Sequence, residues 1–300
     1  MIPKLKPAAF STLFLCFIFL LQGCGPAEEI RIDPGQGMFV FDSYEPLSDK
    51  PVRVFTYRPE GDVSKMPILF VLHGTLRNAD TYRDNWIDIA EEHGVLIVTP
   101  EFNSDDFPGA RGFNLGGMFD EDCNQTGERY WAYSLIEPIF DEVVARVNGS
   151  QESYDIFGHS AGAQFTHRLF LFKENLRANH VISSNAGWYT IPDFEKEFPY
   201  GMKDTALDAE RLQERFSATL LIQLGEDDTD PEDQHLRTTE NAMLQGMHRF
   251  ERGHNFFDMA AAKAAELGSE FNWLIRTVPG VGHENALMAI DAAEYLYGSE

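Results

Sequence analysis

One short turn constrains the fold of this chain more than any other feature, the Gly-His-Ser-Ala-Gly sequence at positions 158–162. An apolar stretch at 153–157 precedes the turn and predicts a strand, and residues 163–172 follow with apolar positions three and four apart, which predicts a helix. The serine of such a turn takes a strained backbone conformation, and glycines flank it because larger side chains would collide with the neighbouring strand or helix. The pattern therefore predicts Ser160 at a helix N-terminus, where the amides and the helix dipole favour developing negative charge.

The rest of the chain alternates predicted strands with predicted helices. Buried strands are predicted at 66–72, 95–100, 180–184, 218–224 and 271–278. Residues 38–44 and 51–58 alternate in polarity and predict an antiparallel pair before them. Helices are predicted at 128–147, 260–267 and 286–297. This order predicts an α/β fold, with a mostly parallel central sheet and helices on both faces, in one domain over 38–300.

The segment 185–214 interrupts this alternation of strands and helices, and it contains aromatic residues together with proline and glycine residues that break regular structure. In sheets of this kind ligands bind beyond the carboxyl ends of the strands. The segment is therefore predicted to be a short cap or one wall of a cleft. Trp188 and Tyr189 follow soon after a strand end, so we expect them to line the substrate cleft, while the other aromatic rings pack the loop onto the domain.

Two further polar side chains follow predicted strands in an order that suits serine chemistry. A serine hydroxyl needs an imidazole to take its proton and a carboxylate to hold that imidazole in the right tautomer. Asp228 follows the strand at 218–224 and His283 follows the last strand. Because parallel strands end at one edge of a sheet, we expect Ser160, Asp228 and His283 to meet there.

Other residues compete for these roles. Asp227 and Asp230 are alternatives for the acid, although the spacing from the loop glycine favours the residue between them. His254 is the nearest alternative for the base, but it follows no clear strand and is expected at the surface or in a cap. His159 is expected to pack or hydrogen bond beside the serine, and His73 to brace the neighbouring loop.

Four segments carry a resemblance to a known superfamily. They are His-Gly-Thr at 73–75, the turn at 158–162, Gly-Glu-Asp-Asp-Thr-Asp at 225–230 and Val-Pro-Gly-Val-Gly-His at 278–283. Over nearly the whole mature chain the sequence resembles the α/β-hydrolases. It looks closest to secreted esterases related to polyhydroxybutyrate depolymerases and feruloyl esterases.

The resemblance implies a role for each matching residue. It implies Ser160 as the nucleophile, Asp228 as the acid and His283 as the base. It also implies an oxyanion hole formed by the backbone amides of Ala161 and Thr75.

Three functions remain open. The first is an esterase that cleaves a small-molecule or polymeric carboxylic ester through an acyl-enzyme. The second is a serine peptidase or amidase of the same fold. The third is a non-catalytic surface lipoprotein, against which three intact side chains at the strand ends argue.

The N-terminal sequence predicts an export signal. Two lysines precede an apolar run at 8–21 that is too short to span a bilayer as a stable helix. The ending Leu-Gln-Gly-Cys at 21–24 resembles a bacterial lipobox. We therefore predict a lipoprotein-type signal peptide at 1–23 and lipidation of Cys24.

A polar tether at 24–37 is then expected between the lipid and the domain. The alternative is an ordinary signal peptide cut near Gly25 or Ala27. Both alternatives predict export, and lipidation predicts anchoring to a bacterial membrane, in the periplasm or at the cell surface.

The charge of the chain excludes one class of partner. The formal net charge is -24 with no basic cluster to offset it, so the surface repels nucleic acid. No His-Glu-x-x-His, paired-cysteine or phosphate-binding motif is present, so no metal or cofactor is expected. We expect a monomer that contacts the membrane only through its lipid.

Overall fold

The computed structural model describes residue 3 and residues 31–298 of the chain. Apart from residue 3, the predicted signal peptide at 1–23 lies outside these residues, and so does Cys24. The tether prediction was too long at its C-terminal end. Ile32 is buried, and strand β1 already begins at Gly35, paired with Arg58 of the next strand. Glycines in this strand hid its polarity pattern, and pairing with the neighbouring strand defines it instead.

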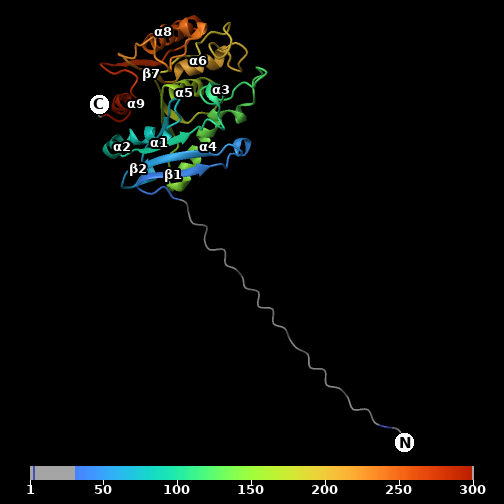
Figure 1. Cartoon of the computed structure of the whole chain (residues 1–300), viewed down its shortest axis with the longest axis vertical. Helices are drawn as coiled ribbons and strands as arrows, with labels where there is room; N and C mark the ends of the chain where they lie inside the picture. Colours follow the sequence, from blue (N-terminus) through green and yellow to red (C-terminus); the bar gives the residue numbers. More distant parts are fainter. Residues whose placement is uncertain (1–2, 4–30, 299–300) are drawn as a thin grey trace. The chain divides into compact units, whose positions relative to one another are not determined.

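Within the described residues the strands form one eight-stranded sheet in the order β1-β2-β4-β3-β5-β6-β7-β8 (Figure 1). The strands are β1 Gly35–Phe41, β2 Val52–Arg58, β3 Ile68–Leu72, β4 Leu96–Glu101, β5 Tyr154–His159, β6 Ala178–Ser184, β7 Leu220–Gly225 and β8 Leu274–Val278. The pairings of β1 with β2 and of β2 with β4 are antiparallel, and the pairings from β4 to β8 are parallel. The predicted α/β architecture is confirmed.

Helices cover both faces of this sheet (Figure 1). The α-helices are α1 Ala79–Asp84, α2 Ile87–His93, α3 Gly109–Gly112, α4 Ile136–Arg146, α5 Ala161–Phe172, α6 Ala209–Ser217, α7 Glu240–Met243, α8 Arg249–Leu267 and α9 Asn285–Tyr297. Short 3-10 helices lie at Glu45–Leu47, Val63–Lys65, Glu128–Tyr130 and Ala132–Leu135. None of the helices in the described part of the chain is long and apolar enough to cross a bilayer.

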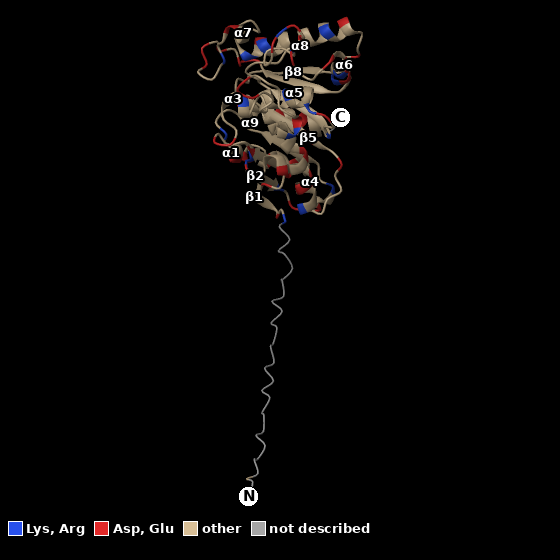
Figure 2. Cartoon of the chain, turned by 90° about the vertical axis from the view of Figure 1, so that its right-hand side faces the viewer, with Lys and Arg blue, Asp and Glu red and all other residues tan. Residues whose placement is uncertain are grey.

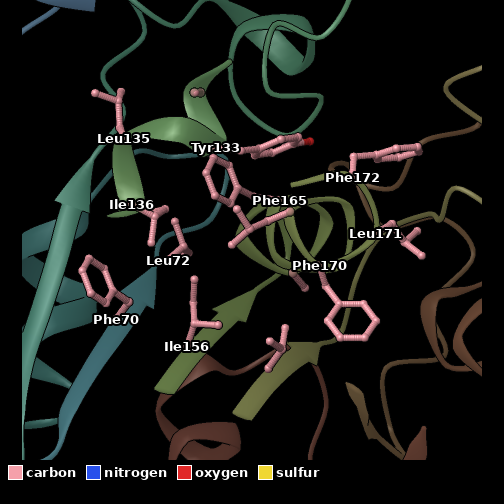
Figure 3. Close-up of a cluster of buried hydrophobic side chains, with 14 of the residues drawn as sticks. Phe70, Leu72, Tyr133, Leu135, Ile136, Ile156, Phe165, Phe170, Leu171 and Phe172 are labelled. Atoms are coloured by element: carbon pink, nitrogen blue, oxygen red, sulfur yellow. The ribbon is translucent and has the colours of Figure 1, made fainter. Parts of the chain in front are cut away.

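The two faces of the sheet bury separate apolar clusters. Phe70 and Leu72 of β3 point into the cluster that contains α4, α5, α6 and α8, while Leu69 and Val71 point into the cluster under α2 and α9. Successive side chains of a strand point to opposite faces, so a strand buried on both faces is apolar throughout. Figure 3 shows the first cluster, with Phe165 of α5 packed over β3 and β5.

Two helix predictions were inaccurate. The predicted helix at 128–147 is two 3-10 turns followed by α4. Helix α8 begins eleven residues before its predicted start at 260, at Arg249. The missed first turns contain Gly253 and Asn255, which have low intrinsic helix propensity, and burial of Arg252 and Phe256 against the domain overrides it.

Candidate active site

The turn between β5 and α5 holds Ser160 in a conformation that few side chains adopt. Its φ is 60° and its ψ is -115°. A Cβ at Gly158 would lie 2.3 Å from the carbonyl oxygen of Gly162, and a Cβ at Gly162 would lie 2.1 Å from that of Leu72. Both glycines are therefore required by the close approach of α5 to β3 and β5. The Ser160 N–H donates to Ser184 of β6, which fixes the serine at the carboxyl edge of the sheet.

The three side chains predicted to act together form a hydrogen-bond chain with His283 in the middle. His283 Nε2 is 3.0 Å from Ser160 Oγ, and His283 Nδ1 is 2.7 Å from Asp228 Oδ2. Asp228 follows β7 and His283 follows β8. This arrangement can pass a proton from a hydroxyl to an imidazole that a carboxylate orients.

The competing residues lie elsewhere. Asp227 and Asp230 are exposed, whereas Asp228 is 4% exposed. His254 lies in α8 with its ring against Phe250. Of the alternatives left open by the sequence, the structure places only Asp228 and His283 beside Ser160.

A buried asparagine that the sequence reasoning missed joins two loops. These are the acid loop after β7, which carries Asp228, and the imidazole loop after β8, which carries His283. Asn185 Oδ1 accepts from Gly225 N–H, and its side-chain amide donates to the carbonyl of Gly282. The Asp227 N–H also donates to Val281. Because these contacts join the ends of β6, β7 and β8, the acid and the imidazole are held at a fixed separation. The position of Asn185 directly after β6 is the one signal in the sequence that could have indicated this role.

The loop after β3 lies against Ser160. A Cβ at Gly74 would lie 3.7 Å from Ser160 Cβ. Thr75 is the next residue, and Ala161 is the first residue of α5, where a backbone N–H has no partner inside the helix. The two predicted oxyanion amides therefore belong to segments that border the serine.

His73 braces this loop from inside the protein. It donates from Nδ1 to the Gly74 carbonyl and accepts at Nε2 from the Phe102 N–H. Burial lowers the pKa of His73 to about 3, so the ring stays neutral and keeps the tautomer that both hydrogen bonds need.

The ring of His159 lies beside the ring of His283 and hydrogen bonds to Tyr82. Its Nδ1 is 3.1 Å from the Tyr82 hydroxyl, and its ring centroid is 4.6 Å from that of His283. Burial, together with the charges of His283 and Arg249, holds the pKa of His159 well below its usual value. The ring is therefore a neutral wall of the site.

The prediction that Trp188 and Tyr189 line the cleft was wrong. Trp188 is 2% exposed and Tyr189 is fully buried. Gln245 accepts from the Tyr189 N–H and donates to its carbonyl, which turns this part of the chain inward. The part of the excursion that does line a hollow, of about 380 Å³, includes Phe198 and Lys203.

Among residues 31–298, no group of three or more His, Cys, Asp or Glu side chains is arranged to hold a metal ion.

Solved structures identify the family. A scan of family models and a search of curated proteins found no match. Poly(aspartic acid) hydrolase-1 from Sphingomonas sp. KT-1 is 38% identical, with a TM-score of 0.86, over 89% of this chain and 100% of that one. A poly(3-hydroxybutyrate) depolymerase from Bordetella parapertussis is 32% identical, with a TM-score of 0.84, over 89% of this chain and 91% of that one. The chain belongs to the α/β-hydrolase family.

The resemblance inferred from the sequence is thereby confirmed. An S-formylglutathione hydrolase from Agrobacterium tumefaciens, 19% identical with a TM-score of 0.58, shares the fold of this hydrolase over 87% of the chain.

The buried neutral state of His73 predicts a pH dependence of folding. Its folded pKa lies below the unfolded value of about 6.5, so the unfolded chain binds the extra proton and stability falls as pH decreases. Between about pH 7.5 and about pH 5.5 this costs about 1.4 kcal/mol. We expect His73→Gln to reduce the pH dependence of the free energy of unfolding by that amount, measured by urea denaturation.

His180 provides a control of opposite sign. Its hydrogen bond to Asp155 raises the pKa of His180, so this histidine contributes stability at low pH. The variant His180→Gln should steepen the loss of stability on acidification. An unchanged slope in His73→Gln would contradict the assignment of His73 as a buried neutral ring.

Proposed function

We propose that this hydrolase is an exported serine enzyme that cleaves carboxylic esters through an acyl-enzyme intermediate. The observation that carries the proposal is the continuous hydrogen-bond chain from Asp228 through His283 to Ser160. The similarity to a poly(3-hydroxybutyrate) depolymerase also supports an ester substrate, either small or polymeric.

The proposed reaction uses each side chain in turn. His283 takes the Ser160 proton as the hydroxyl oxygen attacks the ester carbonyl, while Asp228 accepts from the other ring nitrogen. The amides of Ala161 and Thr75 donate to the oxyanion that forms. His283 then gives its proton to the leaving alcohol, and a water molecule repeats the sequence on the acyl-enzyme to release the acid.

Replacing the nucleophile tests the proposal. We expect Ser160→Ala to lower kcat/KM for p-nitrophenyl acyl esters by roughly 10⁴-fold or more and to abolish labelling by a fluorophosphonate probe. Thr75→Ala is the matched control, because a backbone amide survives this change and activity should be retained. Full activity in Ser160→Ala would exclude the mechanism.

A second candidate is cleavage of a substrate that carries carboxylate groups, in an ester or an amide. Three arginines surround the backbone of Gly187 and the ring of Trp188. Arg168 and Arg237 lie 4.1 Å and 4.6 Å from the centre of that ring, and Arg252 donates to the Gly187 carbonyl. None of the three forms an ion pair with a carboxylate of residues 31–298.

One of these arginines lies on the helix that carries the nucleophile. Arg168 is buried on α5 and donates to the carbonyl of Gln164, one turn after Ser160. Burial lowers the pKa of Arg168 to about 9, and its Nη2 has no hydrogen-bond partner. Positive charge on the helix that begins after Ser160, with no ion-pair partner among residues 31–298, favours an anionic substrate in so acidic a chain. Similarity to a poly(aspartic acid) hydrolase supports the same candidate.

Arg237 is half-buried, so its charge can be removed without opening the core. We expect Arg237→Gln to raise KM for an ester with a free carboxylate by roughly 10-fold and to leave a neutral ester unaffected. The exposed Arg129, changed to Gln, is the matched control. Equal effects on both esters would argue against the second candidate. A separate panel of esters and aminoacyl amides shows whether the enzyme cleaves ester or amide bonds.

Export and lipid anchoring are proposed from the sequence of the N-terminus alone. If Cys24 is lipidated, Cys24→Ser should eliminate palmitate labelling and release the protein from the membrane fraction of a bacterial host. Retention of the label in Cys24→Ser would contradict lipidation at this residue.

A further inference from the structure

The carboxylate of Asp228 is engaged on both of its oxygens. Oδ2 faces His283, and Oδ1 accepts from Arg249 Nη1 at 3.2 Å. The side chains of Asp228 and Arg249 are 3% and 2% exposed. The Phe250 N–H also donates to the Asp228 carbonyl, so the first turn of α8 holds this residue through both its backbone and its side chain.

Arg249 binds a second carboxylate on the same loop. Its Nη2 donates to Asp233 Oδ1 at 2.8 Å, and Asp233 also accepts from the His235 N–H. The Asp233 side chain is 27% exposed, so it lies at the rim of the site. Basic residues at the start of α8 are drawn blue in Figure 2. Arg249 therefore bridges two acids, of which only Asp228 contacts the imidazole.

The second acid changes the charge that His283 experiences. Without Asp233, the charge of Arg249 would offset much of the charge of Asp228 and weaken its attraction for an imidazolium. With Asp233 present, the three groups carry one net negative charge, which the imidazolium neutralises when it forms. Partial burial raises the pKa of Asp233, but the hydrogen bonds from Arg249 and His235, together with the charges of Arg249 and His283, outweigh it and hold the pKa below its usual value.

The other groups near His283 do not supply the negative charge that offsets Arg249. His159 of β5 stays neutral, and Ser160 carries no charge before reaction. Asp227 on the acid loop and Glu284 on the imidazole loop are exposed, where solvent screens their charges.

We propose that Arg249 and Asp233 are paired positioning residues for the reaction. Arg249 fixes the outer oxygen of Asp228, and Asp233 offsets the charge of Arg249 so that Asp228 still stabilises the imidazolium of His283. This inference rests on the proposed function, because it requires that His283 become protonated during turnover.

The pH profile of kcat/KM for a p-nitrophenyl ester tests the pair. Asp233→Asn leaves the arginine charge uncompensated, which disfavours the imidazolium, so we expect kcat to fall about 10-fold and the acidic limb to move to lower pH by about 0.5 to 1 unit. Arg249→Met removes the group that holds Asp228, so we expect kcat to fall. It also leaves the two negative charges of Asp228 and Asp233, which favour the imidazolium, so the acidic limb should move to higher pH. KM should change little in either variant.

Two further variants separate charge from structure. The double variant Asp233→Asn/Arg249→Met should return the limb close to that of the wild type, while kcat stays low. Arg249→Lys should recover part of kcat because it keeps the charge. Glu232→Gln removes an exposed charge from the same loop and is the matched control, with no change expected.

The rate of fluorophosphonate labelling, measured against pH, provides the same readout without a known substrate. No labelling of the wild type would overturn the proposed function and this inference with it. If the wild type is labelled, but the acidic limb does not shift in the single variants or shifts in the same direction in both, this inference alone is overturned. If Arg249→Met fails to fold, the rim position of Asp233 allows Asp233→Asn to decide the result.

Discussion

The close packing of helix α5 against strands β3 and β5 determines the geometry of the site. The backbone of Gly162 approaches the carbonyl of Leu72 so closely that a Cβ would lie 2.1 Å from it. This contact forces the sharp turn at Ser160 and its φ of 60°. Packing of α5 over the sheet stabilises the strained residue, because Phe165 and the other apolar side chains of the helix are buried on that face.

The parallel sheet then determines what can reach the serine. Three successive strand ends, those of β6, β7 and β8, are joined by Asn185, which binds Gly225 and Gly282. A serine at the end of β5 therefore faces an acid and an imidazole whose loops are bonded to each other. A site of this kind can be rigid although its side chains lie on loops, because each loop is anchored at the end of a hydrogen-bonded strand.

The sequence left other acids and another histidine as alternatives, but it predicted the fold and predicted that Ser160, Asp228 and His283 meet at one edge of the sheet. Each of these residues follows a predicted strand, so a local pattern and the topology of the sheet together place it. Trp188 was misassigned because its orientation depends on Gln245, more than fifty residues later, which turns the neighbouring backbone inward. Arg249 was missed for a related reason, since glycine and asparagine obscured the start of its helix.

Charge is distributed differently inside this protein and on its surface. The chain as a whole carries a formal charge of -24, yet Arg168, Arg249 and Arg252 have buried side chains on α5 and α8. A buried guanidinium is stable only where hydrogen bonds replace its water, and carbonyl oxygens satisfy much of that need at Arg168 and Arg252. Arg249 differs because both of its partners are carboxylates. Burying Arg249 and Asp228 near Ser160 carries a desolvation cost that an apolar core would avoid, and the proposed role of Arg249 in orienting Asp228 gives that cost a chemical reason.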